Sequence, residues 1–268
     1  MTALLHAIAA GLYLIVGVIG RVGARNVDAA ARTTRRRVTA GLGIGVVVHG
    51  LAFVAIHAGA TEISLESFAA ALSLIGWLVP MVYLLSLRVA RVPEVGSWVA
   101  FLAGGFSLAA LAGLALSAPA ASPPAAGGTW SHAHVLLSTL GFSLLMITSM
   151  AGIAYLAKER ALKSKRVQRI ALPSLESLDR LEHVTLSLGF SLLTLGVVSG
   201  FVWGLSRGVT LWTYHSAALV VAWSIYLLPV GMRVARREHG DRPARVVVVG
   251  FGVLAFSYLG IRVLGLAT

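Results

Sequence analysis

Long stretches without charged residues alternate along the whole chain with short segments rich in arginine and lysine. A helix needs roughly 20 apolar residues to cross a bilayer, and eight stretches reach that length. They lie at about 1–20, 38–60, 67–87, 97–117, 131–157, 183–206, 208–232 and 245–266. The pattern predicts an all-α integral membrane protein, with one transmembrane domain over residues 1–268 that forms a bundle of eight helices.

Composition agrees with this prediction. Of the 268 residues, 57% are hydrophobic and 12% are charged, a balance that soluble domains do not show. The first apolar stretch has no basic region ahead of it and no convincing small-residue cleavage site after it. It is therefore expected to be a membrane helix and not a signal peptide.

The basic residues are concentrated in four segments, which an eight-span arrangement places on one side of the membrane. These segments, 21–37, 88–94, 158–182 and 233–245, contain 20 of the 22 lysines and arginines. The positive-inside rule makes that side cytoplasmic, so both termini are expected outside the inner membrane of a bacterium. The net charge of +12 follows from this topology, and no folded basic domain is left to bind nucleic acid.

Histidines carry the candidate chemistry. The chain has no cysteine, which excludes thiol–disulfide exchange, cysteine-ligated metals and haem attached through a CxxCH motif. His134 lies about four residues into the fifth span, and His215 lies about seven residues into the seventh. Both spans start outside, so the two imidazoles lie at similar depth in the outer part of the membrane. Two neutral imidazoles on two helices can bind a haem iron between them.

A porphyrin also needs an aromatic wall and cations for its propionates. The outer part of the spans offers Trp203, Trp212 and Tyr214 for the wall, and Arg207 and Arg262 for the propionates. An interfacial aromatic belt and a snorkelling arginine explain the same residues without any ligand.

The other histidines have simpler interpretations. His49 falls near the midplane of the second span and His183 near the inner end of the sixth. Each is either a helix–helix hydrogen-bonding residue or part of a second, deeper haem site. Helix-end or interface packing is the interpretation for His6, His57 and His132, and His239 is interpreted as a solvated loop residue.

Three stretches share more than hydrophobicity with a known family. They are LPSLESLDRLEHVTLSLGFSLLTLGVVSGFVW (172–203), HVLLSTLGFSLLMITSMAGIAYLAKERALK (134–163) and VHGLAFVA (48–55). The first resembles a run ending in GFPLLTIGILSGAVWA in the membrane proteins of cytochrome c assembly, the CcsA/ResC type. The second resembles the segment of that family that opens with an outer-face histidine, and the third resembles its early membrane histidine segment.

The resemblance implies a haem-handling function, and it maps the family's histidines onto His49, His134, His183 and His215. The tryptophan-rich W-x-W-D-P-K-E segment of the family is absent, and LWTYHSAALVVAW (211–223) stands in its place. The chain is therefore most similar to the divergent YpjD/HemX-like branch, which also has eight spans. Because this segment is missing, the resemblance does not extend to haem delivery to an apocytochrome. It still implies a helical scaffold that binds haem.

The resulting hypothesis is an inner-membrane protein related to cytochrome c biogenesis that binds b-type haem through His134 and His215. Haem binding or transport is expected rather than catalysis, with membrane lipid, haem and other cytochrome c assembly proteins as partners. Two alternatives are open: a membrane haem b electron carrier with the same ligands, and a haem-free accessory or regulatory subunit. A solute transporter is less favoured, because no acidic residue falls inside the expected spans.

The distribution of basic residues predicts the topology directly. Reporters fused after residue 30, 165 or 240 are expected to report a cytoplasmic location. Fusions after residue 123 or at the C-terminus are expected to report the periplasm, because these positions follow four and eight spans in an arrangement that starts outside. Paired alkaline phosphatase and green fluorescent protein fusions measure both locations, and a cytoplasmic C-terminus would contradict the eight-span count.

Overall fold

The computed structural model describes residues 2–23, 29–58, 67–116, 129–164, 172–206, 208, 214–235 and 238–260. Within these residues the regular structure is helical, without β-strands. Eight of the helices are long and apolar enough to cross a membrane. This confirms the predicted all-α fold with eight spanning helices and a multi-pass membrane protein, whereas the side on which the termini lie stays a prediction.

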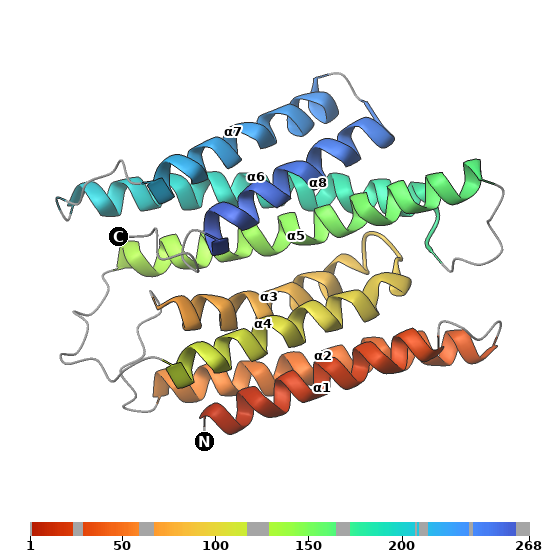
Figure 1. Cartoon of the computed structure of the whole chain (residues 1–268), viewed down its shortest axis with the longest axis horizontal. Coiled ribbons are helices and arrows are strands. Elements are labelled where there is room, and N and C mark those ends of the chain that lie inside the picture. Colours follow the sequence, from red (N-terminus) through yellow and green to blue (C-terminus); the bar gives the residue numbers. More distant parts are fainter. Residues whose placement is uncertain are drawn as a thin grey trace. The chain divides into compact units, whose positions relative to one another are not determined.

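The helices follow one another along the chain (Figure 1). They are α1 (Thr2–Gly23), α2 (Ala29–Ala58), α3 (Phe68–Ser86), α4 (Gly96–Leu116), α5 (Thr129–Lys163), α6 (Leu175–Ser206), α7 (Tyr214–Val234) and α8 (Asp241–Ala255). The short helix η1 (Pro93–Val95) precedes α4, and the π-helical segment η3 (Phe256–Gly260) continues α8.

Some helices extend beyond the apolar stretches that predict them. Helix α6 begins at Leu175 rather than near residue 183, and α5 continues to Lys163. Helical hydrogen bonds close within the helix itself, so a helix need not end where the hydrocarbon ends. Hydropathy locates only the apolar part of each helix. As a result Asp179 and Glu182, outside the expected sixth span, belong to α6.

The chain divides into two compact units, Met1–Val135 and Leu136–Thr268. Unit 1 contains α1 to α4, and unit 2 contains most of α5 together with α6 to α8. The boundary falls inside α5. Each unit has its own buried contacts.

Glycines bring α1 and α2 close together in unit 1. A Cβ atom at Gly45 would lie 2.4 Å from Cε1 of Tyr13, and a Cβ atom at Gly41 would lie 2.5 Å from Cγ2 of Val16. Such distances leave no room for a methyl group, so small residues are what allow this close approach. The Tyr13 side chain is fully buried as a consequence.

The first two basic segments meet at one end of unit 1. Arg35 at the start of α2 forms an ion pair with Glu94 of η1, with 2.8 Å between Nη1 and Oε1. The Arg21 guanidinium carbon lies 4.5 Å from the ring centroid of Trp98 in α4, a cation–π contact. The end of α1 and the start of α2 therefore lie at the same end of this unit as the α3–α4 connection, as the eight-span pattern predicts.

Helices α5 and α6 approach each other closely at two glycines in unit 2. A Cβ atom at Gly141 would lie 2.6 Å from the backbone nitrogen of Leu193, and one at Gly196 would lie 2.9 Å from the backbone nitrogen of Ser138. Further along the same pair of helices, Thr148 donates a 2.8 Å hydrogen bond to Thr185 Oγ1. Backbone therefore packs directly against backbone here, which requires glycine at the contact.

Aromatic side chains hold the last two helices against this pair. The Phe142 ring of α5 lies 5.2 Å from the ring of Phe251 in α8, measured between centroids. On α7, Trp223 donates a 2.9 Å hydrogen bond to Thr194 Oγ1 of α6. The same indole stacks on Phe190, with ring centroids 5.7 Å apart. Each contact joins an aromatic face to a neighbouring helix and leaves the Trp223 N–H satisfied.

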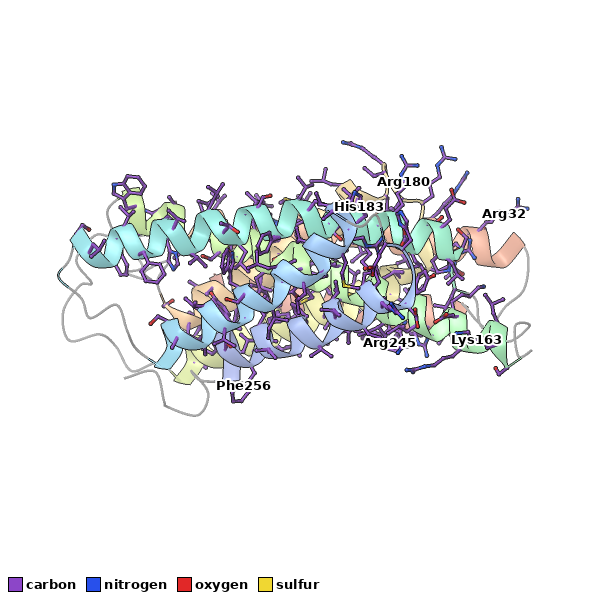
Figure 2. The ribbon with its side chains drawn as sticks, turned by 90° about the horizontal axis from the view of Figure 1, so that it is seen from above. Arg32, Lys163, Arg180, His183, Arg245 and Phe256 are labelled. Carbon is purple, nitrogen blue, oxygen red and sulfur yellow. The ribbon has the colours of Figure 1, made fainter. Side chains whose placement is uncertain are left out.

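The third and fourth basic segments also gather at one end of their unit. Lys158 of α5 donates a 3.3 Å hydrogen bond to the carbonyl oxygen of Leu172, just before α6. Figure 2 shows Lys163, Arg180 and Arg245 toward one end of the unit 2 helices, with Phe256 well away from them. The α5–α6 and α7–α8 connections are thus on one side of unit 2.

The α5–α6 contact predicts a specific sensitivity to one methyl group. Gly141→Ala is expected to lower the thermal midpoint in detergent, because the new Cβ meets the immovable backbone of Leu193 and overpacking costs about 1–3 kcal/mol. Gly252→Ala in α8 is the matched control, since nothing lies within 4 Å of its Cβ position. That control is expected to keep or raise the midpoint, because alanine is the better helix former by about 1 kcal/mol. Thermal midpoints are measured by far-UV circular dichroism. Equal midpoints for the two variants would contradict direct backbone contact between α5 and α6 at Gly141.

Candidate functional site

The four predicted haem-related histidines occupy different environments. His134 lies near the start of α5 and is half-buried. Helical periodicity puts it on the face of α5 that also carries Ser138 and Gly141. His215 lies in the first turn of α7, and its side chain is outside the described part of the structure. His49 is fully buried in unit 1, and His183 is exposed on α6 of unit 2.

One of the remaining predicted site residues has a buried polar atom without a partner among the described residues. The Trp203 indole nitrogen, near the end of α6, is buried and has no hydrogen-bond partner among the described residues. Three of the predicted residues lie outside the described residues, namely Arg207, Trp212 and Arg262. Tyr214 begins α7, but its side chain is also outside the described part.

A second group of histidines comes together inside unit 1. His6 Nε2 of α1 lies 2.8 Å from Ser73 Oγ of α3, and His49 Nε2 of α2 lies 3.1 Å from the same oxygen. On its other side, His49 Nδ1 lies 3.5 Å from Ser107 Oγ of α4. All four side chains are at most 1% exposed. The interpretation of His6 as a helix-end residue is therefore too simple, because it shares a buried polar cluster with His49.

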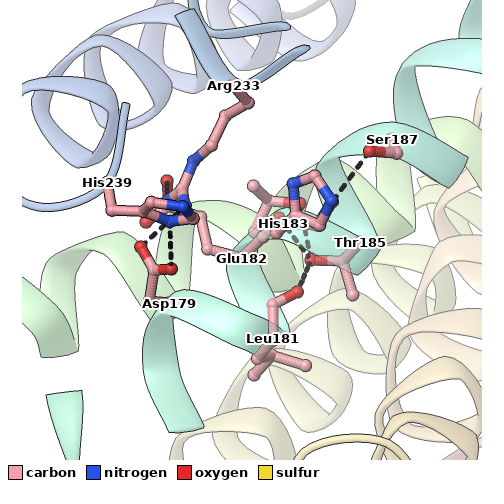
Figure 3. Close-up of polar contacts among 9 residues, drawn as sticks. Asp179, Leu181, Glu182, His183, Thr185, Ser187, Arg233 and His239 are labelled. Carbon is pink, nitrogen blue, oxygen red and sulfur yellow. Dashed lines mark hydrogen bonds and ion pairs between the residues drawn. The ribbon is translucent and has the colours of Figure 1, made fainter. Parts of the chain in front are cut away.

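An ionic cluster joins α6, α7 and the segment before α8 in unit 2 (Figure 3). Arg233 Nη2 donates a 2.7 Å hydrogen bond to Glu182 Oε1, and Arg233 Nη1 forms a 2.7 Å ion pair with Asp179 Oδ1. The Glu182 side chain is 0% exposed and that of Arg233 is 1% exposed. One guanidinium thus compensates a fully buried carboxylate and a second carboxylate that is partly exposed.

His239 adds a donor to this cluster. Its Nδ1 lies 2.9 Å from Asp179 Oδ2 and 3.2 Å from Arg233 Nη1. A guanidinium can only donate and an ionised carboxylate can only accept. Since Nδ1 cannot serve both, the shorter contact decides, and His239 donates its Nδ1–H to Asp179. The histidine is tied to α6 and is not simply a solvated loop residue.

The spacing of two acidic residues indicates this cluster, but both lie outside the apolar stretch from which the sixth span is predicted. Asp179 and Glu182 are three residues apart, so on a helix they share one face. Arg233 lies in the last turn of α7. Helix α6 thus carries a buried acid just before the expected sixth span, and a guanidinium compensates its charge.

A family comparison accounts for most of the chain. The family model for cytochrome c assembly proteins matches residues 44–267. The chain belongs to the cytochrome c assembly protein family. This confirms the resemblance on which the sequence interpretation partly rested.

Individual members of the family are similar over about half of the chain. The cytochrome c biogenesis protein CcsA of Synechococcus sp. (strain CC9605) is 29% identical over 168 residues, covering 53% of this chain and 55% of the relative. CcsA of Guillardia theta is 30% identical over 161 residues, with 53% and 54% covered. CcsA of Chlamydomonas reinhardtii is 28% identical over 151 residues, with 54% and 42% covered. The chain spans about half the length of these curated relatives, and no solved structure matches it.

The region that matches the cytochrome c assembly family contains most of the predicted histidines but not His6. It includes His49, His134, His183 and His215, and it begins well after His6. The buried partnership of His6 with Ser73 and His49 is therefore a feature of this chain that family membership does not itself imply.

The ionic cluster predicts that replacing one member of the buried pair lowers stability more than replacing both. Arg233→Met is expected to destabilise the protein by about 3–5 kcal/mol, because it leaves the Glu182 charge buried and uncompensated. The double variant Glu182→Met with Arg233→Met is expected to lose much less, because no buried charge is left. Thermal or denaturant unfolding in detergent measures both.

A matched control is available on α8. Arg245 pairs with Asp241, but its side chain is 63% exposed, so Arg245→Met is expected to cost no more than about 1 kcal/mol. A double variant as unstable as Arg233→Met would contradict the assignment of a buried, charge-compensating pair.

Proposed function

We propose that this protein handles haem for cytochrome c biogenesis in the cytoplasmic membrane of a bacterium, with both termini outside. Membership of the cytochrome c assembly family over residues 44–267 is the observation that carries the proposal. The relatives named above are cytochrome c biogenesis proteins. The role is one of binding or transfer, with haem, membrane lipid and other assembly proteins as partners.

The proposed ligand is b-type haem, bound through the imidazoles of His134 and His215. The donor chemistry fits, because the chain has no cysteine and haem iron accepts two axial imidazoles. Zinc is less well served, since the described residues contain no group of three or more His, Cys, Asp or Glu side chains that could hold a metal. When bound, the haem would supply an iron centre that takes axial ligands and exchanges one electron.

Trp203 gives structural support for a ligand near the end of α6. A buried N–H group without an acceptor is costly, and buried polar groups in proteins almost always have a partner. The Trp203 indole nitrogen has none among the described residues. A ligand with carboxylate groups, such as haem, supplies an acceptor of the required kind.

The remaining predicted residues have proposed roles around the same ligand. Trp212 and Tyr214 would contribute to the aromatic wall, and Arg207 and Arg262 would bind the propionates. His134 lies one turn before Ser138 on the same face of α5, and its side chain is half-buried. His49 and His183 stay predicted contributors to a second site or an access route.

The test is the absorption spectrum of the purified protein after expression with ample haem. The wild-type protein is expected to show a Soret band and sharp reduced α and β bands. His134→Ala or His215→Ala should remove most of the bound haem, because one imidazole cannot maintain a bis-ligated iron. Added imidazole should partly restore the spectrum of His134→Ala by filling the vacated axial position.

His132→Ala is the matched control. His132 is exposed and lies two residues before His134 on α5, so the helix turns it to a different face. Its replacement should leave the spectrum unchanged. A wild-type protein without a Soret band, or a His134→Ala variant with a normal one, would contradict the proposal and favour the haem-free accessory role.

A further inference from the structure

One end of unit 1 carries a concentration of arginine side chains. Among the described residues this end contains no lysine and a single carboxylate, Glu94, which already pairs with Arg35. Six further arginines here are exposed and have no ion-pair partner among the described residues. They are Arg21, Arg32, Arg36, Arg37, Arg88 and Arg91. We refer to these six residues as the arginine surface of unit 1.

Buried contacts among the four helices hold this surface together. A Cβ atom at Gly20 of α1 would lie 3.0 Å from Cγ2 of Val38 in α2 and 2.7 Å from Cβ of Ser97 in α4. Tyr83 of α3 donates a 3.0 Å hydrogen bond to the carbonyl oxygen of Val92, just before η1. These contacts place the arginine-bearing ends of α1 and α2 and the α3–α4 connection at one level of the unit.

That level corresponds to the headgroup region of a membrane. Arg21 lies in the last turn of α1, and Arg32 begins the part of α2 that is apolar enough to cross a membrane. The Arg21 guanidinium carbon is 4.5 Å from the ring centroid of Trp98, which is itself half exposed. Tryptophan is enriched at membrane–water interfaces. An arginine held against it is therefore well placed to meet lipid phosphates.

The basic end of unit 2 differs, because several of its charges are compensated within the unit. Lys163 pairs with Glu159, and Arg245 pairs with Asp241. Arg233 lies between two carboxylates of α6. The positive-inside rule accounts for basic residues at both ends but not for this difference in compensation. The arginine surface of unit 1 is left to attract an anion from outside the unit.

Arginine suits phosphate in particular. Its planar guanidinium presents N–H donors in a fork that matches a phosphate group, and it is more weakly hydrated than the ammonium group of lysine. Clusters of basic residues next to spanning helices attract anionic lipids. A zwitterionic phospholipid has the same phosphate but no net negative charge. An anionic phospholipid therefore satisfies both the hydrogen-bonding geometry and the charge of this surface.

We propose that the arginine surface of unit 1 binds the headgroups of anionic phospholipids. The position of Arg21 and Trp98 at the end of spanning helices favours a lipid over a soluble polyanion. The inference makes the proposed lipid partner specific, and it rests on that part of the proposed function alone. A purified protein without a Soret band would contradict haem binding and would leave this inference standing.

The test is native mass spectrometry of the full-length protein, released from detergent micelles that contain equal amounts of phosphatidylglycerol and phosphatidylcholine. The wild-type protein is expected to retain phosphatidylglycerol in preference by on the order of 10-fold or more, because each nearby arginine contributes roughly five-fold to binding of an anionic lipid surface. The preference should fall as the concentration of ammonium acetate rises, since salt screens exposed charges.

Arg32→Gln combined with Arg36→Gln is the test variant. These residues lie one turn apart on α2, and neither has an ion-pair partner among the described residues. The variant is expected to lower the preference for phosphatidylglycerol by on the order of 10-fold. Lys163→Gln combined with Arg245→Gln is the matched control, because it removes the same charge from residues that already pair with carboxylates. The control should stay close to the wild type.

Two checks accompany the variants. Far-UV circular dichroism shows whether each variant is folded, and the reporter fusion after residue 165 shows whether the topology is unchanged. If the test variant does not fold, the lipid preference of the wild type and its salt dependence decide the question without it.

Three results would overturn the proposal. The first is equal retention of the two lipids by the wild-type protein. The second is an equal loss of preference in the test variant and in the unit 2 control, which would mean that charge at either end acts in the same way. The third is displacement of bound phosphatidylglycerol by an equimolar short oligonucleotide, which would assign the surface to a soluble polyanion.

Discussion

Inside a bilayer no water is present to satisfy a backbone amide or carbonyl group, and the rest of this structure depends on that constraint. A chain that crosses hydrocarbon must close its hydrogen bonds within each span, which here means helices. Serine and threonine hydroxyls face the same shortage of water. Many of them donate to carbonyl oxygens one turn earlier, as Ser143 does to Thr139 and Thr148 does to Leu144.

Helix association then depends on shape, because lipid tails are as apolar as the side chains that face them. In unit 2 the glycines at 141 and 196 allow α6 backbone to touch α5 backbone. In unit 1, Gly45 lies directly against the ring of Tyr13. These contacts set the rotation of each helix about its axis. That rotation decides which polar side chains face a neighbouring helix and which face outward.

Each unit buries a polar cluster among its described residues. The two clusters differ in how they offset the cost of burying polar groups. The cluster of unit 1 is neutral, with two imidazoles and two hydroxyls connected by directed hydrogen bonds. The cluster of unit 2 is charged and lies at the end where the basic connections gather, with Arg233 between two carboxylates. A neutral cluster whose members are hydrogen-bonded to one another costs little to bury. The ionic cluster compensates its own charges and ties α6 to α7, while Glu182 Oε2 and Arg233 Nε are buried without a hydrogen-bond partner among the described residues.

The sequence by itself determined the features that depend on local composition. The eight spans follow from runs of apolar residues, the gathering of basic connections follows from their positions between spans, and the family follows from short similar stretches. The depth of His134 could be predicted in the same way, by counting residues along one helix. The pairing of His6 with His49, and the burial of Glu182 against Arg233, were decided only by the tertiary structure. Hydropathy gives the depth of a side chain but not the direction it faces, and that direction is set by close contacts between helices far apart in the sequence.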